Sequence, residues 1–373
     1  MNYEIFEKIN KILSYLEDEE SKKIFLQRVL YRMSGDMEHI FRIASYSNAF
    51  KFEDLYSRYL EIDEKYHIYS RMDVLNFLIS KDYKEKKIIL FGVGNWGRMI
   101  YQLLDCVGIE VFAVWDNHKA GETFFRHTVR KPETDDILLE QGLFLISSPV
   151  YAEEMSAQLR EMGIQEETIF LPDINSIIAY YGTPYFDPDF FKPKKNAVFI
   201  DGGAWGMETA IDFSKQCPDY KQIYSFEPDA INYARCENTI KEKQLKNMKV
   251  FPCGLWEEEG VLHFTRAGDD GGGSFIGEDG TTMVQVDSID HVLQGERADF
   301  IKMDIEGSEL SALEGAKQTI QKYKPWLAIC LYHKPDDIFE IPLYIKELVP
   351  EYKMGIRHYS TYVYDTVLYC WVE

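Results

Sequence analysis

The sequence contains no apolar run approaching the roughly 20 residues that a membrane-spanning helix needs. Its amino terminus also lacks the basic and then apolar pattern of a secretory signal. We therefore expect a cytoplasmic protein that has no membrane partner.

Basic residues are scarce relative to acidic ones. The 373-residue chain has 41 Lys and Arg against 62 Asp and Glu, which gives a formal net charge of −21. Because binding to nucleic acid phosphates requires a basic surface, this balance argues against a nucleic acid partner.

Cysteine is sparse, and no two cysteines are spaced as C-x-x-C. Buried free thiols are therefore the preferred interpretation over a metal or disulfide role. The six positions are Cys106, Cys217, Cys236, Cys253, Cys330 and Cys370.

A short apolar run followed by glycines is the most informative feature that is present. Residues 197–200 predict a buried parallel strand, which ends in Asp201. Gly202, Gly203 and Gly206 follow, and they allow a tight turn to which a ligand can come close. A ligand is therefore expected at the carboxyl end of this strand.

A second predicted strand, residues 222–226, ends in Glu227 and Pro228. Glu227 follows Asp201 by 26 residues (227 − 201), about the length of one strand-helix-strand unit. Glu227 should thus lie beside the glycine turn, where a carboxylate can accept hydrogen bonds from both ribose hydroxyls of a nucleoside.

The glycine spacing narrows the choice of nucleoside. Counted from Gly202, a dinucleotide fingerprint would require glycines at the positions of Ala204 and Met207. An acid before the glycines also suits a ligand with an ammonium and a sulfonium group better than one with two phosphates. This profile favours S-adenosylmethionine.

Five ordered motifs between about Val198 and Val372 together resemble the FkbM family of S-adenosylmethionine-dependent methyltransferases. They begin at Phe199 (FIDGGA), Tyr224 (YSFEPD), Val286 (VDSID), Phe300 (FIKMDIEGSEL) and Leu331 (LYHKPDD). The resemblance implies an α/β fold, the class I methyltransferase doubly wound sheet, over residues 196–373. One departure is Met207, where the family usually has glycine.

Further site residues are expected along the same sheet edge. The strand at residues 249–253 should bring Cys253, Gly254 and Leu255 to the adenine, and a glycine-rich segment offers Ser274 as an acceptor contact. The resemblance extends to the pair Arg357 and His358, which we predict to contact substrate.

Three residues are candidates for catalysis. Asp304 and Glu306 should point to the same side at the end of the strand at residues 300–305, because side chains alternate along a strand. His333 follows the next strand, at residues 326–331. His333 is the first choice as general base, because its ordinary pKa lies near neutral. In the alternative hypothesis, the three side chains bind a divalent metal that acidifies a hydroxyl.

The first half of the chain carries less chemistry. Residues 1–85 have helical apolar periodicity and predict a helical cap or an arm that forms a homo-oligomer. Residues 86–175 predict a small Rossmann-like, nucleotide-binding-type domain, and residues 176–195 a linker rich in proline, tyrosine and phenylalanine. Its tyrosines, Tyr180, Tyr181 and Tyr185, are expected to pack rather than to stack on a sugar.

The small domain contains a true G-x-G-x-x-G pattern, at Gly92, Gly94 and Gly97, with Asp116 at the end of the next strand. It could hold NAD or another nucleotide. Alternatively, the glycines serve only close packing of a helix on a strand.

The sequence therefore predicts an O-methyltransferase that uses S-adenosylmethionine. The family resemblance implies a small-molecule acceptor such as a sugar, a glycan precursor or a similar polyhydroxylated metabolite. Two alternatives remain: an NAD-dependent sugar-modifying oxidoreductase centred on Gly92–Gly97, and a non-catalytic nucleotide-binding protein.

Overall fold

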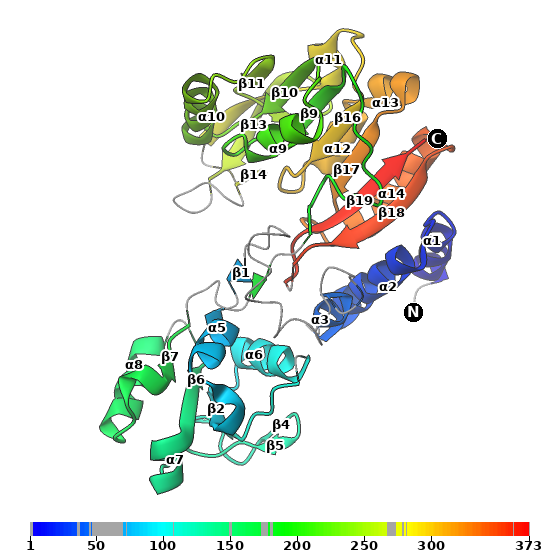
Figure 1. The fold of residues 1–373 in the computed structure, drawn as a ribbon. Coiled ribbons are helices and arrows are strands. Elements are labelled where there is room, and N and C mark those ends of the chain that lie inside the picture. Colours follow the sequence, from blue (N-terminus) through cyan, green and yellow to red (C-terminus); the bar gives the residue numbers. More distant parts are fainter. Residues whose placement is uncertain are drawn as a thin grey trace. The chain divides into compact units, whose positions relative to one another are not determined.

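A computed structural model describes residues 3–35, 38–44, 46, 70–71, 73–106, 108–148, 151–172, 178–179, 182–266, 274–277, 280, 282–360 and 362–372. Tyr180 and Tyr181 lie outside these residues. The chain forms two compact units (Figure 1). The first comprises residues 1–32, 183–359 and 363–373, and the second comprises residues 33–182 and 360–362.

The first unit is built on a seven-stranded sheet of order β11-β10-β9-β16-β17-β19-β18. All neighbouring strands are parallel except β19, which is antiparallel to both of its neighbours. The strands are β9 (Val198–Gly202), β10 (Gln222–Phe226), β11 (Met248–Phe251), β16 (Phe300–Met303), β17 (Trp326–Cys330), β18 (Lys353–His358) and β19 (Thr366–Trp371).

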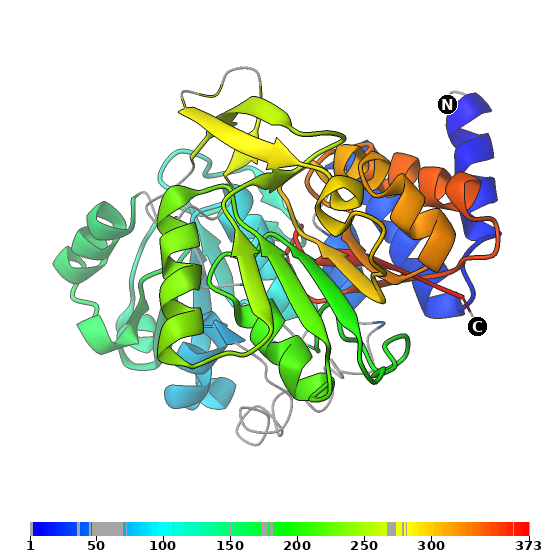
Figure 2. The same ribbon diagram turned by 90° about the horizontal axis from the view of Figure 1, so that it is seen from above.

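Helices flank this sheet (Figure 2). They are α9 (Glu208–Gln216), α10 (Ala230–Glu242), α11 (Ile289–Leu293), α12 (Glu309–Glu314), α13 (Lys317–Tyr323) and α14 (Asp337–Leu348). The doubly wound α/β sheet predicted for residues 196–373 is thus confirmed. A smaller sheet of order β12-β15-β13-β14 adjoins it, made of β12 (Gly254–Leu255), β13 (Gly260–Thr265), β14 (Phe275–Ile276) and β15 (Thr282–Asp287).

Strand β9 lies in the middle of the sheet, and every one of its residues is buried. Phe199 stacks on Phe213 of α9 with ring centroids 4.4 Å apart, and Phe300 of β16 lies 5.6 Å from Phe199. Phe186 and Phe191 also pack into this cluster, although they belong to the predicted linker. Residues from 183 onward are therefore part of the first unit.

The amino-terminal helices α1 (Tyr3–Leu13) and α2 (Glu19–Ser34) are described with the first unit up to residue 32. The segment between them lies along the edge strand β18, where Leu16 bridges Met354 and the Glu17 N–H donates to the Met354 carbonyl at 3.0 Å. A covered edge strand is protected from pairing with other chains. A role of these helices in forming a homo-oligomer stays a prediction.

The second unit contains a four-stranded parallel sheet of order β3-β2-β6-β7. Its strands are β2 (Lys87–Phe91), β3 (Ala113–Trp115), β6 (Gly142–Ile146) and β7 (Ile169–Phe170), and two strand pairs, β1 (Ser70–Arg71) with β8 (Ile178–Ala179) and β4 (Thr123–Phe124) with β5 (His127–Thr128), accompany it. Its helices are α3 (Glu38–Ala44), α5 (Asp73–Ser80), α6 (Asn95–Cys106), α7 (Asp136–Gln141) and α8 (Ala152–Glu161), with 3-10 turns at Tyr83–Glu85 and Glu166–Thr168.

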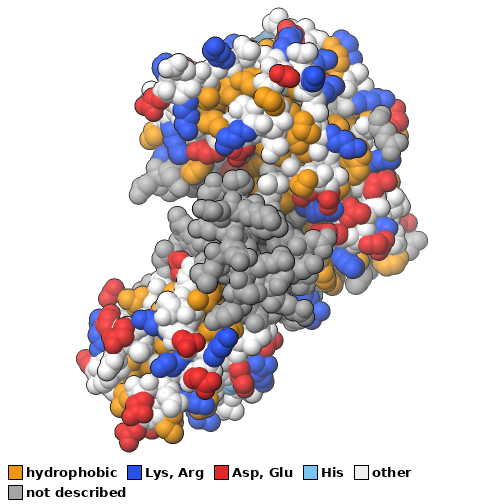
Figure 3. Space-filling view, viewed as in Figure 1, with side chains coloured by type: hydrophobic (Ala, Val, Ile, Leu, Met, Phe, Trp, Pro, Cys, Tyr) orange, Lys and Arg blue, Asp and Glu red, His pale blue; other side chains and the backbone are white. Residues whose placement is uncertain are grey.

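The surface carries mixed charge. On the face drawn in Figure 3, Lys and Arg side chains are scattered among Asp, Glu and hydrophobic side chains. Within the described part of the chain, no helix is both long enough and apolar enough to cross a membrane.

Ser21 provides a test of how α2 is attached. The Ile356 N–H donates to the buried Ser21 hydroxyl at 2.8 Å. We predict that Ser21→Ala lowers the free energy of unfolding by about 1–3 kcal/mol, because it leaves that buried donor without its partner. Chemical denaturation measures this, with Ser14→Ala as control, since the exposed Ser14 hydroxyl bonds only within its own helix end. Equal, small effects of both substitutions would contradict the assignment.

Candidate active site

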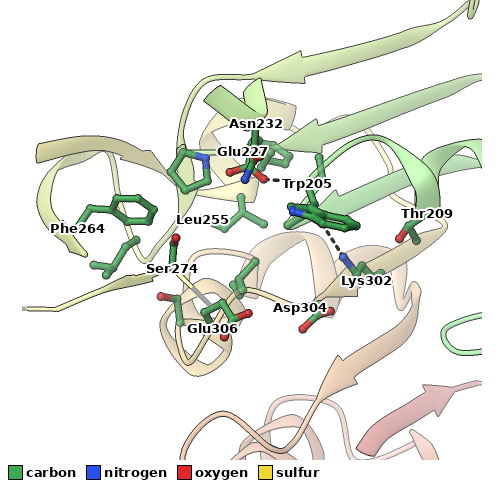
Figure 4. Close-up of a pocket in the computed structure, with 18 of the residues that line it drawn as sticks. Trp205, Thr209, Glu227, Asn232, Leu255, Phe264, Ser274, Lys302, Asp304 and Glu306 are labelled. Atoms are coloured by element: carbon green, nitrogen blue, oxygen red, sulfur yellow. Dashed lines mark hydrogen bonds between the residues drawn. The ribbon is translucent and has the colours of Figure 1, made fainter. Parts of the chain in front are cut away.

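A pocket of about 320 Å³ opens at the carboxyl ends of β9, β10 and β16 (Figure 4). Backbone turns form part of its wall, and polar and aromatic side chains form the rest. The lining residues are Tyr185, Gly203, Ala204, Trp205, Glu208, Thr209, Phe226, Glu227, Pro228, Asn232, Gly254, Leu255, Phe264, Ser274, Ile276, Lys302, Asp304, Ile305, Glu306 and Ser308.

The glycine turn requires glycine at one position in particular. Gly203 has a φ of 82°, and a Cβ atom there would lie 2.0 Å from the Asp304 carbonyl oxygen. A side chain would therefore push β9 away from the turn after β16. Gly206 differs, since a Cβ would meet only the movable side chains of Glu208 and Arg235.

Lys302 binds the backbone of this turn, a role that was not predicted from the sequence. Its Nζ donates to the carbonyl oxygens of Gly202 and Gly203, both at 2.8 Å, and lies 3.3 Å from Asp201 Oδ1. Lys302 is 2% exposed and Asp201 is fully buried. Asp201 and Gly202 are therefore not in the wall of the pocket, and they act by shaping it. The available signal was a single lysine within the otherwise apolar strand β16.

Burial acts differently on the two partners, Asp201 and Lys302. It raises the pKa of Asp201 in spite of the Lys302 charge. Burial alone would lower the pKa of Lys302, but the charges of Asp201 and Asp304 outweigh it and raise that pKa. Lys302 is consequently an ammonium ion at neutral pH, with two carbonyl oxygens as hydrogen-bond acceptors and Asp201 as its ion-pair partner.

Some residues with strained backbone lie at the pocket. Tyr185, Trp205 and Glu306 line it with positive φ angles of 69°, 47° and 54°. Met207 also has a positive φ, of 76°, at the position where the family usually has glycine, and its side chain is fully buried in the core. Such conformations cost about 1–3 kcal/mol each and occur preferentially at functional sites.

Glu227 lies as predicted beside the glycine turn. Its two carboxylate oxygens accept hydrogen bonds from the backbone N–H groups of Trp205, at 2.9 Å, and Asp229, at 3.0 Å. Burial raises the pKa of Glu227. Because each carboxylate oxygen has two lone pairs, both remain able to accept a ligand hydroxyl.

Only some of the residues predicted to contact the cofactor line the pocket. Pro228, Gly254 and Leu255 line the pocket, whereas Cys253 is buried and does not. Gly206 is likewise absent from the wall.

Asp304 lines the pocket, is held by two tyrosine hydroxyls and lies close to His333. Its Oδ2 accepts from the Tyr185 hydroxyl at 2.7 Å, its Oδ1 accepts from the Tyr332 hydroxyl at 2.8 Å, and His333 Nε2 lies 3.3 Å from Oδ1. Burial would raise the pKa of Asp304, but the neighbouring His333 and the charge of Lys302 hold it well below its usual range. Asp304 is therefore a fixed, ionised carboxylate.

His333 does not have the character predicted for it. Its Nδ1 lies 2.8 Å from Glu309 Oε1, and its Nε2 lies 3.4 Å from Glu306 Oε2. Burial on its own would lower the pKa of His333, but Glu309 and Asp304 raise it to about 11. The expectation of a base with a near-neutral pKa is thus corrected, because a ring already protonated at neutral pH cannot accept a proton.

The alternative of a divalent metal held by Asp304, Glu306 and His333 is not supported by the structure. His333 Nδ1 is hydrogen-bonded to Glu309, and Nε2 lies 3.3 Å from Asp304 and 3.4 Å from Glu306 without a hydrogen-bond partner in the part of the chain that the structure describes. Among the described residues, no group of three or more His, Cys, Asp or Glu side chains is arranged to hold a metal ion.

Of the three predicted substrate contacts, only one lies at the pocket. Ser274 lines the pocket. Arg357 and His358 are buried elsewhere in β18, which corrects their prediction as substrate contacts. Arg357 pairs with Asp18 at 3.2 Å and Asp189 at 2.8 Å, and His358 Nδ1 bonds the Thr366 hydroxyl.

In the second unit, the glycine pattern serves packing. A Cβ on Gly97 of α6 would lie 2.2 Å from the Gly92 carbonyl oxygen, and one on Gly92 would lie 2.5 Å from Ser147 Oγ. Asp116 accepts hydrogen bonds from the backbone N–H groups of Val93, His118 and Lys119. It therefore braces the loop itself, and this favours the packing interpretation over a site for NAD or another nucleotide. Of the three glycines in this pattern, only Gly94 has open space at its Cβ position.

Residues 194–352 match the family model of the Methyltransferase FkbM domain. This region is therefore an FkbM methyltransferase domain with the class I fold, and the protein is a methyltransferase. The resemblance carried by the five sequence motifs is confirmed, and the match supports an enzyme over the non-catalytic alternative.

Among solved structures, the chain is similar to a methyltransferase FkbM from Methylobacillus flagellatus KT, with 19% identity over 87% of this chain and 100% of that chain and a TM-score of 0.45. Precorrin-6y C5,15-methyltransferase from Geobacter metallireducens GS-15 has 11% identity over 49% and 83% of the two chains and a TM-score of 0.33. An S-adenosylmethionine-dependent methyltransferase from Aquifex aeolicus has 15% identity over 49% and 85%, with a TM-score of 0.30. A comparison with curated proteins gave no match.

A methyltransferase of this class implies S-adenosylmethionine as methyl donor, and the residues present fit it. Glu227 offers acceptor lone pairs for ribose hydroxyls, and Gly203 leaves the turn without a side chain. Gly254 and Leu255 provide apolar wall near Pro228. These residues would hold the donor.

Gly203→Ala tests the turn. Because its methyl group would collide with the Asp304 carbonyl, we predict that the affinity for S-adenosylmethionine falls by about tenfold or more, which is at least ~1.4 kcal/mol. Isothermal calorimetry measures the affinity. Gly206→Ala is the matched control, and the prediction fails if both variants bind the donor as the unaltered protein does.

The protonation of His333 is directly observable. We predict that nitrogen NMR finds both ring nitrogens protonated at a pH of about 8, where an ordinary histidine is neutral. Because the folded pKa of about 11 exceeds the ordinary 6.5, the stability from this charge is complete below about pH 6.5 and is lost as the pH rises through about 11. His333→Gln assigns the signal, and a ring that titrates near 6.5 would overturn this account.

Proposed function

We propose that the protein is a cytoplasmic S-adenosylmethionine-dependent O-methyltransferase. Its acceptor is a hydroxyl group of a sugar, a glycan precursor or a similar small polyhydroxylated metabolite. The observation that carries the proposal is the group of hydrogen-bond acceptors beside the donor pocket, formed by Asp304, Glu306 and the hydroxyl of Tyr185. A ligand that fits such a wall must bring hydrogen-bond donors, as a polyol does.

The chemistry needs positioning more than proton transfer. When bound, S-adenosylmethionine supplies a methyl group on a sulfonium, which an oxygen in line with the sulfur can take. The chain contributes by fixing both partners: Glu227 and the glycine turn hold the donor, and the carboxylates of Asp304 and Glu306 hold the acceptor. Holding two reactants in line accounts for a large share of the rate of such displacements.

We assign the acceptor proton to Glu306. This carboxylate lines the pocket and is 37% exposed, whereas both oxygens of Asp304 already accept tyrosine hydroxyl protons. The O–H bond of the acceptor breaks toward Glu306 as the new C–O bond forms. His333 lies beside both carboxylates, with its Nε2 3.3 Å from Asp304 Oδ1 and 3.4 Å from Glu306 Oε2.

Methyl transfer from labelled S-adenosylmethionine to a panel of polyols and their amine analogues tests the proposal. We predict label on the hydroxyl compounds and a mass increase of one CH₂ in the product. Glu306→Gln should lower the turnover rate by roughly 10²-fold without changing donor affinity, because it removes the proton acceptor. Labelling of amines alone would contradict O-methylation, and an unchanged rate in the variant would contradict the role of Glu306.

A further inference from the structure

Tyr185 reaches the pocket from a segment that the sequence presents as a linker. The segment is anchored in the core of the first unit by Phe186, Phe190 and Phe191. Tyr185 itself has a φ of 69°, a conformation that a bulky residue adopts only where its surroundings impose it.

A buried chain of hydrogen bonds holds the backbone of Tyr185 in place. Its N–H donates to the Tyr369 hydroxyl at 2.9 Å, and the Tyr369 and Tyr359 hydroxyls are 2.6 Å apart. The Tyr359 hydroxyl donates to Asp187 Oδ2 at 2.7 Å. Tyr369 must therefore donate its own hydroxyl proton to the Tyr359 oxygen. Burial raises the pKa of Tyr359 and Tyr369 well above 10, and both therefore remain donors.

The side chain of Tyr185 is also fixed. Its hydroxyl donates to Asp304 Oδ2 at 2.7 Å, and Lys302 Nζ lies 5.1 Å from the centre of its ring. Since its proton is committed to Asp304, the oxygen of Tyr185 can only accept a hydrogen bond from a ligand.

Tyr332 provides an internal comparison. Its hydroxyl donates to the other oxygen of Asp304 at 2.8 Å, so the two tyrosines support the same carboxylate. Tyr185 lines the pocket, whereas Tyr332 is not part of its wall.

We propose that Tyr185 is an acceptor-orienting residue, which takes the hydrogen bond of a second hydroxyl of the polyol acceptor, beside the hydroxyl whose proton goes to Glu306. The inference rests on the proposed function and adds a specificity to it. Hydroxyl groups can donate to Tyr185, whereas a phosphate or carboxylate group has no proton to give at neutral pH and faces Asp304 and Glu306.

The test compares Tyr185→Phe with Tyr332→Phe in the full-length protein. Both keep the aromatic ring and remove one hydrogen bond to Asp304. For an acceptor found in the polyol panel, we expect Tyr185→Phe to raise KM about tenfold, while Tyr332→Phe changes KM less than about threefold. Affinity for S-adenosylmethionine should stay unchanged in both variants.

The outcomes separate the two proposals. If the unaltered protein methylates an acceptor and both variants raise its KM equally, Tyr185 only supports Asp304 and the inference is wrong. An unchanged KM in Tyr185→Phe overturns it as well. If the unaltered protein binds S-adenosylmethionine but methylates no hydroxyl compound, the proposed function fails, and the inference fails with it.

Discussion

One buried ammonium group holds the active-site edge of the sheet together. Lys302 joins β16 to the turn after β9 by bonding two carbonyl oxygens, and it neutralises Asp201 beneath that turn. Burying a lysine without partners would cost several kcal/mol, so its position depends on all three oxygens. The same charge keeps Asp304 ionised, and a series of alternating charges then crosses the site: Asp201, Lys302, Asp304, His333 and Glu309.

The sequence predicted the parts of the site that depend on local signals. Strand β9 was evident from its apolar run, and the crossover length placed Glu227 beside the glycine turn. Chain topology alone then brings Asp304 to the same edge, because the carboxyl ends of parallel strands meet there. Those residues required no knowledge of distant contacts.

The sequence could not predict what distant side chains do to a group. The pKa of His333 depends on Glu309, whose position follows from the turn that opens α12. Arg357 matches a family motif, yet in this chain it pairs with Asp18, more than 300 residues earlier. Tyr185 looked like a packing residue, because only the folded chain places its hydroxyl on Asp304.

The role of Lys302 can be measured most directly with the double variant Asp201→Asn/Lys302→Met, which removes the ammonium without leaving a buried carboxylate unpaired. The account predicts a folded protein, judged by circular dichroism, whose affinity for S-adenosylmethionine by calorimetry is at least about tenfold lower, because the glycine turn has lost its anchor. Undiminished donor affinity in that folded variant would contradict it.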